Sequence, residues 1–350
     1  MRRLILISFL FATFSCTTLP TKPAPLKQTE LFTKMNRSSL VLLVNGKENG
    51  SAAFISEDGL AASAAHCIKF RDDKLEVISP VHGRLPAKLQ AIDKAHDLIL
   101  LKVDTKDKKI DFLKPSTSIP KTLDVVYQIG SPVYRRGVVQ KGTIARNDIY
   151  YEYYGEHHKH YIEIIHVSAS VQGGTSGGPW VNKQGEFIGI QSGTLLVGDS
   201  PSGIAFMAPV HKFMDIIQSR KSAQSRNLDF KVLPLEAHDS GTIKRYHNFK
   251  SGLVVSDISS ESVARKGGLK KWDLIVAVDD IPVKSTKQLL DYVRSSDSKE
   301  IELTIIEIDE KKSKLKNIPV EIVEDRIIFR NLPKKVASAQ GAKARSSTTK

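Results

Sequence analysis

The chain has little cysteine and no long apolar run. Among 350 residues only Cys16 and Cys67 are cysteines, so a disulfide-stapled scaffold and a four-cysteine zinc site within one chain are both excluded. The longest apolar stretch, residues 4–14, is too short to span a bilayer. Hydrophobic residues still make up 41% and charged residues 26% of the chain, which excludes a wholly disordered or fibrous protein. At this length we expect two domains with appendages.

Acidic residues are scarce relative to basic ones. Lys and Arg number 52 against 38 Asp and Glu, a net charge of +14 that suggests an anionic partner such as nucleic acid or a membrane. Half of this excess lies at the ends of the chain, on Arg2, Arg3 and five basic residues of the segment 331–350. That segment contains no acidic residue and little apolar surface, so it is predicted to be a disordered basic tail. The remaining charge does not indicate nucleic-acid binding.

The first residues have the pattern of an export signal. Arg2 and Arg3 precede the apolar run, and Ser15-Cys16 follows it, which predicts a signal peptide over residues 1–15. A cysteine at this place resembles the acylation site of bacterial lipoproteins, so Cys16 is a candidate lipid attachment site that would anchor the protein to a membrane. Plain secretion, with the cysteine incidental, is the alternative. Residues 16–30 are rich in Pro and Thr and are predicted to form an extended tether.

The body of the chain has the texture of an antiparallel β protein. Between about residues 36 and 207, short β-branched and apolar runs alternate with turn signals, for example residues 39–44, 98–103 and 123–130. This pattern indicates a sandwich or a barrel. After Pro209 the period changes to that of an amphipathic helix over residues 210–217, and the polar residues 218–227 are predicted to be a linker.

Three separated segments carry residues for nucleophilic catalysis. His66 follows an apolar strand pattern, Asp97 precedes the buried run 98–101, and Ser176 lies within the glycine-dense turn 173–178. A serine hydroxyl is a weak nucleophile until an imidazole takes its proton, and that imidazole needs an acid to fix its tautomer. Glycines beside the serine allow a sharp turn and let backbone N–H groups converge where an oxyanion would form.

These segments resemble the chymotrypsin-like serine proteases, and their surroundings resemble the HtrA/Deg branch. The residues that carry the second resemblance are the runs 50–60, 128–132, 142–144 and 203–209. The resemblance implies a chymotrypsin-like double β-barrel over residues 31–217 and assigns His66 as general base, Asp97 as orienting acid and Ser176 as nucleophile. It also implies an oxyanion hole formed by the N–H groups of Gly174 and Ser176. No metal or organic cofactor is needed for this chemistry.

The same resemblance limits which side chains the enzyme would accept before the cleaved bond. Two residues beside the predicted catalytic ones, Cys67 and His96, can also be interpreted. Ser170 stands where trypsin-like enzymes carry a pocket aspartate, and Ile204, Ala205 and Phe206 imply an apolar pocket wall, so cleavage after small or medium aliphatic residues is expected. Cys67 lacks the disulfide partner found in chymotrypsin relatives, because Ser51 holds that position, and it is expected to be a buried free thiol. His96, adjacent to Asp97 on a presumed strand, is expected at the surface.

Residues 150–161 combine five tyrosines with His157, His158 and His160. A hairpin with aromatic cross-strand pairs is the simplest interpretation. In the resemblance this hairpin is a regulatory loop. A zinc or copper site at the histidines, or a pH response, remains open but is disfavoured, since adjacent histidines in a hairpin rarely converge.

Residues 228–325 resemble a small α/β PDZ domain of the bacterial HtrA type. The supporting runs are 252–258, 262–269 and 271–278, followed by a helical period over 286–295 and a strand over 301–308. PDZ domains bind extended chain ends by adding a strand to a sheet edge. The matching loop, near Phe230, Lys231 and Val232, lacks the glycine expected there. Carboxylate capture and a purely structural PDZ domain both remain open.

Taken together, the sequence predicts an exported, envelope-anchored serine endopeptidase of HtrA type that acts on misfolded or regulatory proteins. Its expected partners are unfolded or extended protein substrates and, through a lipid on Cys16, a membrane facing the periplasm. The resemblance further implies a homotrimer, to which residues 31–35 would contribute. Two alternatives use the same residues differently: a non-catalytic chaperone or binding protein on the same fold, and a basic nucleic-acid or surface adhesin that rests on charge alone.

Overall fold

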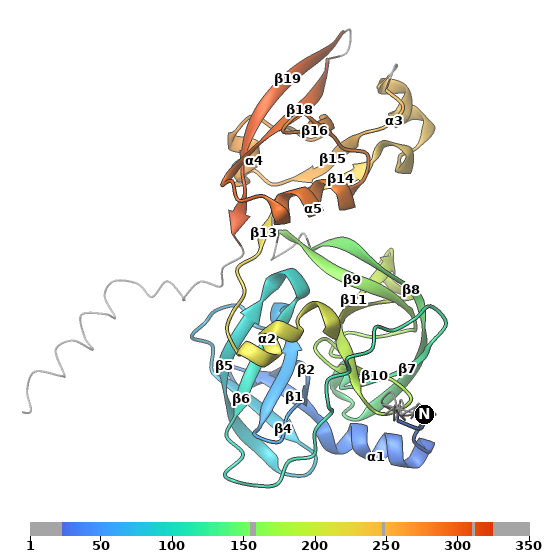
Figure 1. Cartoon of the computed structure of the whole chain (residues 1–350), viewed down its shortest axis with the longest axis vertical. Coiled ribbons are helices and arrows are strands. Elements are labelled where there is room, and N and C mark those ends of the chain that lie inside the picture. Colours follow the sequence, from blue (N-terminus) through green and yellow to red (C-terminus); the bar gives the residue numbers. More distant parts are fainter. Residues whose placement is uncertain (1–22, 155–158, 247–248, 310–311, 325–350) are drawn as a thin grey trace, which may run out of the picture.

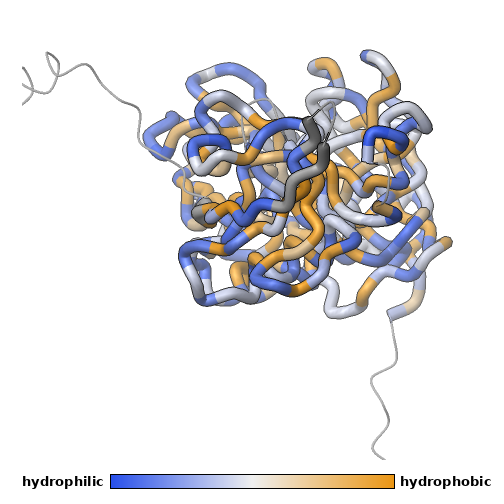
Figure 2. The backbone as a smooth tube through the Cα atoms, turned by 90° about the horizontal axis from the view of Figure 1, so that it is seen from above, coloured by the Kyte–Doolittle hydropathy of each residue, from blue (hydrophilic) through white to orange (hydrophobic). Residues whose placement is uncertain are grey.

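The computed structural model describes residues 23–154, 159–246, 249–309 and 312–324. A pair of β-barrels forms the larger body, and a smaller α/β body lies above it in the view of Figure 1. Short polar and apolar stretches alternate along the trace (Figure 2). Such alternation is expected of strands with one face in a core and the other toward solvent, because successive side chains of a strand point to opposite faces. The mainly β class predicted from the sequence is confirmed.

The first barrel is built from six antiparallel strands that close in the order β1-β2-β3-β6-β5-β4. They are β1 (Ser39–Val44), β2 (Lys47–Phe54), β3 (Leu60–Ala64), β4 (Leu75–Ser79), β5 (Gly83–Asp93) and β6 (Leu98–Val103). Large apolar side chains such as Leu42, Phe54 and Leu101 fill its interior and are fully buried. Closure leaves this sheet without an exposed edge, so every strand is held on both sides.

The second barrel repeats this plan in the order β10-β11-β12-β9-β8-β7. Its strands are β7 (Val125–Gly130), β8 (Val138–Tyr154), β9 (His160–Ser168), β10 (Pro179–Val181), β11 (Phe187–Val197) and β12 (Ser200–Pro209). Trp180 is its largest core residue, and its indole N–H donates to the Gln191 side chain over 2.9 Å. The buried Trp therefore keeps its polar atom satisfied.

Strand β6 shows how the two barrels are joined. Ile99 and Leu101 point into the first barrel, whereas Leu98 and Leu100 point into a shared core that also holds Ile190 of the second barrel. A strand buried on both faces needs a continuous apolar run rather than an alternating one. This requirement explains the sequence after Asp97, and it fixes that residue at the junction of the barrels.

Helix α1 (Gln28–Ser38) covers this shared core and begins within the segment predicted to be a tether. Leu31 and Met35, one helical turn apart, are buried in the core of their own chain. These two side chains are therefore covered within their own chain, and the contribution of residues 31–35 to a trimer stays a prediction. Phe32, on another face of the helix, is exposed.

The smaller body contains a sheet in the order β14-β15-β16-β18-β19, with β14 at one edge. Its elements are β13 (Arg226–Asn227), β14 (Phe230–Pro234), α3 (Ser240–Arg245), β15 (Leu253–Ile258), α4 (Val263–Lys266), β16 (Leu274–Val278), β17 (Ile281–Pro282), α5 (Thr286–Ser295), β18 (Glu300–Asp309), β19 (Lys312–Glu321) and β20 (Val323–Glu324). Helix α5 coincides with the predicted helix over 286–295 and buries Leu289, Leu290 and Val293.

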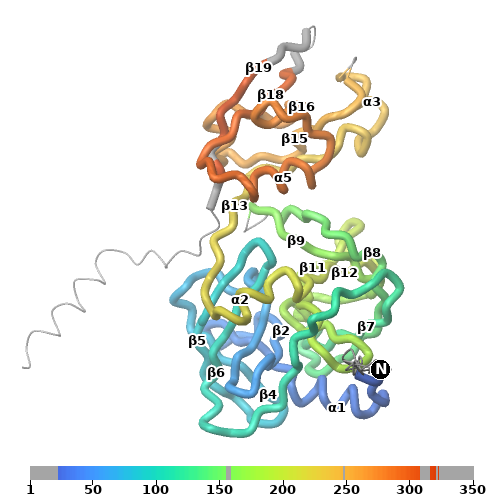
Figure 3. Tube along the Cα trace, in the orientation of Figure 1, coloured from blue at the N-terminus to red at the C-terminus, as the bar shows by residue number. Residues whose placement is uncertain are grey.

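Two connections tie the bodies together. Helix α2 (Met214–Ser219) leads into residues that run along the first barrel, where the N–H of Ala223 donates to the carbonyl of Ile92 over 3.0 Å, before β13 begins. The long hairpin of β8 and β9 extends from the second barrel toward β13 and α5 (Figure 3). Within the described ranges, no helix is long and apolar enough to cross a membrane.

Candidate active site

The three predicted catalytic residues come from three turns at the junction of the barrels. His66 lies in a 3-10 turn (Ala65–Cys67) directly after β3, and Asp97 follows a second one (Lys94–His96) directly before β6. Strands β3 and β6 are neighbours in the first barrel, so their pairing brings these two turns together. Ser176 lies in the connection from β9 to β10 of the second barrel.

His66 and Asp97 form a closely held pair. The Nδ1 atom of His66 lies 2.7 Å from Oδ2 of Asp97, and the backbone N–H of His66 donates to Oδ1 over 2.9 Å. Both carboxylate oxygens therefore contact the same histidine. These contacts fix the orientation of the ring, with Nδ1 toward Asp97 and Nε2 on the side of the ring away from it. Asp97 is 2% exposed and has a left-handed backbone with φ of 50°. Sparsely populated backbone conformations of this kind cluster at active sites, and Asp97 is a predicted functional residue.

Ser192 is a further member of the site that the sequence reasoning missed. Its hydroxyl donates to Oδ2 of Asp97, so the buried carboxylate has partners from both barrels. Ser192 is itself buried and interrupts the apolar part of β11. A polar residue at the end of a buried strand run was the signal that could have identified it.

The charges of the pair support each other. Burial disfavours the charged form of His66, but the adjacent Asp97 carboxylate outweighs this effect and raises the pKa of His66 well above its usual value. Burial likewise disfavours the Asp97 carboxylate, yet His66 together with the hydrogen bonds from His66 and Ser192 keeps the pKa of Asp97 below its usual value. Asp97 therefore remains ionised and able to stabilise an imidazolium.

The turn around Ser176 is fixed by hydrogen bonds to the first barrel. The N–H of Ser51 donates to the carbonyl of Ser176 over 2.7 Å, and the Ser51 hydroxyl donates to the carbonyl of Gly174 over 2.8 Å. The N–H of Ser131 in turn donates to the Ser51 hydroxyl over 3.0 Å. Ser51, which replaces a disulfide partner in the resemblance, thus holds the candidate oxyanion loop by hydrogen bonds.

Two glycines are required by this turn. Gly174 and Gly177 have φ of +94° and +80°, in the left-handed region that side chains rarely adopt. A Cβ on Gly177 would collide with the carbonyl of Ser51 and the hydroxyl of Ser63. The backbone next to Ser176 can therefore approach the first barrel only because these residues lack side chains.

Cys67 is a free, buried thiol, as the sequence predicted. Its Sγ lies 3.9 Å from the carbonyl of Ser176, so the residue after His66 packs directly against the turn that carries the predicted nucleophile. This contact confirms that the His66 turn and the Ser176 turn meet.

A cavity of about 360 Å³ opens beside the candidate oxyanion loop. It is lined by Glu48, Asn49, Gly50, Ser131, Val133, Tyr134, Gly173 and Gly174. Val133 and Tyr134 both have positive φ, at 47° and 63°, and are exposed. No motif of the sequence points to this cavity.

The predicted pocket residues lie on neighbouring segments. Ile204, Ala205 and Phe206 belong to β12, where Ala205 and Phe206 are buried, and Ser170 is exposed in the loop after β9. The N–H of Ala169 donates to the carbonyl of Gly203 over 2.9 Å, which joins the two segments. An apolar wall is thus present, and its role in specificity stays a prediction.

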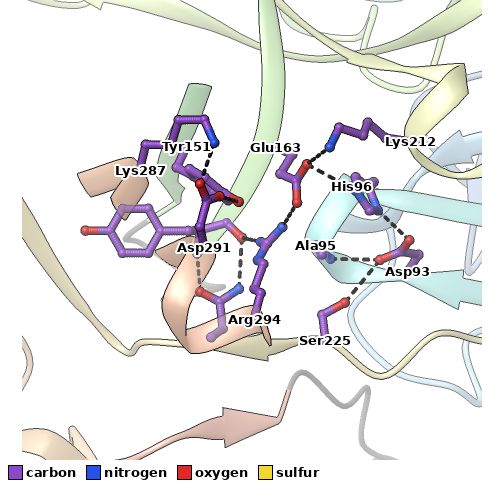
Figure 4. A network of polar contacts seen from close by, with 12 residues as sticks. Asp93, Ala95, His96, Tyr151, Glu163, Lys212, Ser225, Lys287, Asp291 and Arg294 are labelled. Atoms are coloured by element: carbon purple, nitrogen blue, oxygen red, sulfur yellow. Dashed lines mark hydrogen bonds and ion pairs between the residues drawn. The ribbon is translucent and has the colours of Figure 1, made fainter. Parts of the chain in front are cut away.

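His96 is not a surface residue, and the expectation that it would be is wrong. Residues 94–96 form a turn rather than a strand, so the alternation of side chains does not apply. The ring is largely buried, with Nδ1 2.6 Å from Asp93 and Nε2 3.6 Å from Glu163 (Figure 4). Burial alone would lower the pKa of His96, but these carboxylates, Asp93 above all, raise it to about 8.

Glu163, on β9, connects this histidine to the smaller body (Figure 4). Its carboxylate pairs with Lys212 over 3.1 Å and with Arg294 of helix α5. The Arg294 guanidinium also lies 4.8 Å from the centre of the Tyr151 ring, in cation–π geometry. Burial opposes ionisation of Glu163, yet these cations and His96 hold its pKa well below the usual range. A charged network therefore runs from α5 to the residue beside Asp97.

The three predicted PDZ residues, Phe230, Lys231 and Val232, lie in strand β14 rather than in a loop. Phe230 and Val232 point into the core, and Lys231 is half-buried. The N–H of Val232 at this sheet edge is occupied, since it donates to the Tyr161 hydroxyl over 2.7 Å. Tyr153 likewise donates to the carbonyl of Asp229 over 3.2 Å. Tyrosines of the β8–β9 hairpin thus contact the edge where an extended chain would add.

The structure describes only some of the other predicted features, which are the histidines of residues 150–161 and the two ends of the chain. His160 is buried, whereas His157 and His158 lie outside the described residues, as do Cys16, the predicted signal segment and the tail 331–350. Within the part of the chain that the structure describes, no cluster of three or more histidines, cysteines or acidic residues is placed to hold a metal ion. The hairpin itself is confirmed by the pairing of Tyr153 with Tyr161.

Comparison with known proteins agrees with this geometry. Residues 50–190 match the trypsin-like peptidase domain and residues 254–307 match the PDZ domain. Mouse serine protease HTRA4 is 28% identical over 261 residues, which cover 71% of this chain and 53% of that protein. A probable periplasmic serine endoprotease DegP-like from Pseudomonas fluorescens is 26% identical over 290 residues, 79% of this chain and 60% of its own length. The chain thus spans little more than half the length of these relatives.

Solved structures support the fold. The HtrA-type protease AlgW with a bound tripeptide superimposes with a TM-score of 0.56 at 21% identity, covering 88% of this chain and 99% of that one. The serine endoprotease from Yersinia pestis gives a TM-score of 0.53 at 19% identity, with 86% and 99% coverage. The double barrel followed by an α/β domain is therefore an arrangement that these proteins share.

Proposed function

Because this chain joins a trypsin-like peptidase domain to a PDZ domain and is homologous to the HtrA and DegP-like serine proteases, we propose that it is a serine endopeptidase. The observation that carries the proposal is the buried Asp97 carboxylate, which contacts Nδ1 of His66 at 2.7 Å beside the turn of Ser176. An imidazole held by a carboxylate in this way can activate the hydroxyl of a serine on the adjacent turn, which supports the proposal.

The chemistry proceeds in two halves. His66 takes the proton of the Ser176 hydroxyl through Nε2, while Oγ of Ser176 forms a bond to the carbonyl carbon of the substrate. The same proton then passes from His66 to the departing amine as the C–N bond breaks, which leaves an acyl-enzyme. Water attacks the ester in the second half, with His66 again moving the proton, and releases the free acid. Asp97 stabilises the imidazolium at each step.

The oxyanion of each tetrahedral intermediate is assigned to the N–H groups of Gly174 and Ser176. The hydrogen bonds of Ser51 to the carbonyls of Gly174 and Ser176 support this assignment, because they fix the loop before substrate arrives. The acyl side of the substrate would meet Ile204, Ala205 and Phe206, with the uncharged Ser170 nearby. We therefore expect cleavage after small or medium aliphatic residues.

Substrates and location follow from the second domain and the relatives. The PDZ domain suits recognition of unfolded or extended protein chains, and AlgW has been solved with peptides of three and ten residues. Several relatives are named as periplasmic endoproteases, which supports an envelope location for this chain. The N-terminal sequence adds a signal peptide and a lipid on Cys16, and HtrA-type enzymes suggest a homotrimer. Misfolded or regulatory envelope proteins are the substrate class that fits.

The test is cleavage of unfolded casein by the purified protein. The unaltered chain should produce discrete fragments whose new ends follow aliphatic residues, and Ser176→Ala should leave casein intact while folding normally by circular dichroism. Cleavage that persists in Ser176→Ala would assign the nucleophile elsewhere. Fragments ending mainly in Lys or Arg would contradict the proposed pocket.

A further inference from the structure

Tyr154 lies against the catalytic pair without any role assigned to it so far. It is the last residue of β8, and its hydroxyl lies 2.9 Å from the hydroxyl of Ser192. Its ring meets the His66 ring edge-on, with centres 6.1 Å apart and planes at 72°. A residue of the β8–β9 hairpin thus reaches the base of the active site.

The direction of this hydrogen bond follows from the neighbouring one. The hydroxyl of Ser192 has a single proton, which it donates to Asp97. It can therefore only accept from Tyr154, so the hydroxyl groups form a chain from Tyr154 through Ser192 to the carboxylate. Burial and the nearby Asp97 charge raise the pKa of Tyr154 well above its usual value, so this donor keeps its proton.

The adjacent residue of β11 leaves the space that Tyr154 fills. A Cβ on Gly193 would collide with the Tyr154 hydroxyl and would lie 3.3 Å from the Phe206 ring. Tyr154 also packs against the buried cluster of Ile162, Ile164 and Phe206, as does Ile204 of the predicted pocket wall. The tyrosine ring therefore takes the volume that a side chain at position 193 would otherwise occupy, between His66 and β12.

A substrate must pass this point. Its cleaved carbonyl lies at Ser176, and an extended chain advances about 3.3–3.6 Å per residue. For a chain whose cleaved carbonyl lies between Ser176 and His66, the residue that precedes the cleaved one is therefore within reach of the His66 ring, which Tyr154 contacts edge-on. The ring of Tyr154 is flat and apolar, and the charge of Asp97 below it is already paired with His66 and Ser192.

We propose, on the basis of the protease function above, that Tyr154 both orients Asp97 through Ser192 and forms the floor of the subsite for the residue preceding the cleaved one, which restricts that residue to small, uncharged side chains. The hydroxyl makes Tyr154 a positioning residue for catalysis. The ring makes it a determinant of specificity. These two parts can be separated by substitution.

The experiment compares Tyr154→Phe and Tyr154→Ala on matched peptide substrates with Ala or Leu at the position before the cleaved residue. In Tyr154→Phe the ring remains, so kcat should fall about tenfold for both peptides, while KM and the Leu-to-Ala preference stay unchanged. In Tyr154→Ala the floor is removed, and the ratio of kcat/KM for Leu over Ala should rise at least tenfold.

Two controls connect the effect to the proposed contacts. Tyr150, on the same face of β8 but partly exposed, provides the matched variant Tyr150→Phe, which should leave the preference unchanged. The double variant Tyr154→Phe with Ser192→Ala should have the kcat of Ser192→Ala alone, because the tyrosine acts through that serine. Fully additive effects would overturn the positioning role.

An unchanged Leu-to-Ala ratio in a folded Tyr154→Ala would overturn the specificity role. If this variant unfolds, Tyr154→Leu, which keeps an apolar volume without the flat ring, should still change the ratio, and its failure to do so counts equally against the proposal. Labelling by a serine-reactive phosphonate distinguishes a failure of the proposed protease function from a failure of the proposed role of Tyr154. An unlabelled wild-type protein contradicts the protease function, whereas a labelled protein with an unchanged ratio contradicts only the role of Tyr154.

Discussion

His66 is the residue on which the rate depends most directly, because it must be neutral to accept a proton. The Asp97 carboxylate raises its pKa well above the ordinary value near 6.5, so the imidazole is protonated over more of the acid range than a free histidine. We expect kcat/KM for a peptide substrate to rise with pH and to reach half its maximum above pH 6.5.

Asp97→Asn should lower kcat by about 10⁴-fold. It should also move the midpoint to lower pH, and a midpoint that does not move would contradict the assigned pairing.

Gly177 provides a test of the turn that carries Ser176. Gly177→Ala introduces a Cβ that collides with Ser51 and Ser63 and forces a side chain into the left-handed region, so we expect a loss of about 2 kcal/mol or more in unfolding free energy. Gly173→Ala is the matched control, since none of the described residues has an atom within 4 Å of its Cβ position. Urea unfolding of both variants measures the difference. Equal stability of the two would show that the turn is not constrained as described.

Single residues were predictable from the sequence where their chemistry is tied to a local pattern. The glycine-dense turn around Ser176 and the histidine after an apolar strand both pointed to positions that the fold brings together at the junction of the barrels. Ser192 and Tyr154 were not identified, because their importance depends on contacts between residues far apart in the chain, such as the bond from Ser192 to Asp97. No pattern of spacing encodes such a contact.

At the scale of elements, the turn over residues 94–96 connects Asp97, the proposed orienting acid, to the β8–β9 hairpin. His96 faces Asp93 and Glu163, and the cations Lys212 and Arg294, together with His211, are packed around the same carboxylate. The protonated histidine is thus part of a compensated network rather than an isolated buried charge.

This network predicts a pH dependence of stability. The pKa of His96 is about 8 when folded and near 6.5 when unfolded, so its contribution is fully present below pH 6.5 and is lost as pH rises through 8. The contribution is about 2 kcal/mol by that difference. His96→Gln should therefore destabilise the protein at pH 6 much more than at pH 9, as measured by urea unfolding. A penalty that is the same at both pH values would contradict the protonated state of His96.

Sequence periodicity predicted the strands and helix α5 but not helix α1. The alternating runs were visible because half-buried strands repeat every two residues, and α5 shows a clear apolar face at Leu289, Leu290 and Val293. In α1 the buried apolar side chains are only Leu31 and Met35, and polar residues surround them. The Pro- and Thr-rich residues before it suggested a tether, and tertiary packing overrode that local signal.

At the scale of the whole molecule, the hairpin holds the PDZ domain by the surface that an extended peptide would use. Tyr151 and Tyr153 bond to Asp291 of α5 and to the carbonyl of Asp229, on the two sides of that surface. A peptide that adds to β14 must therefore displace the hairpin, and its apparent affinity is reduced by the cost of doing so.

Removal of these hydroxyl groups should strengthen peptide binding. We expect the double variant Tyr151→Phe, Tyr153→Phe to bind peptides with a free, apolar C-terminus several-fold more tightly than the unaltered protein, by fluorescence anisotropy. Tyr134→Phe, at an exposed position remote from the hairpin sequence, is the control. Amidated peptides distinguish carboxylate capture from simple strand addition. Unchanged affinity in the double variant would show that the hairpin does not compete.

The two-domain organisation was visible in the sequence, whereas the way the domains meet was not. The linker residues and the PDZ-like runs marked a boundary near residue 228. The docking depends on side chains such as Arg294 and Tyr161, whose partners belong to the other domain and lie more than sixty residues away in the chain.

The central claim is that Ser176 is a nucleophile activated by His66, and labelling with a diphenyl phosphonate followed by mass spectrometry tests it most directly. The account predicts a single adduct on Ser176 in the unaltered protein, none in Ser176→Ala, and much slower labelling in His66→Ala. An unlabelled protein, an adduct on another residue, or labelling of His66→Ala at the unaltered rate would contradict it.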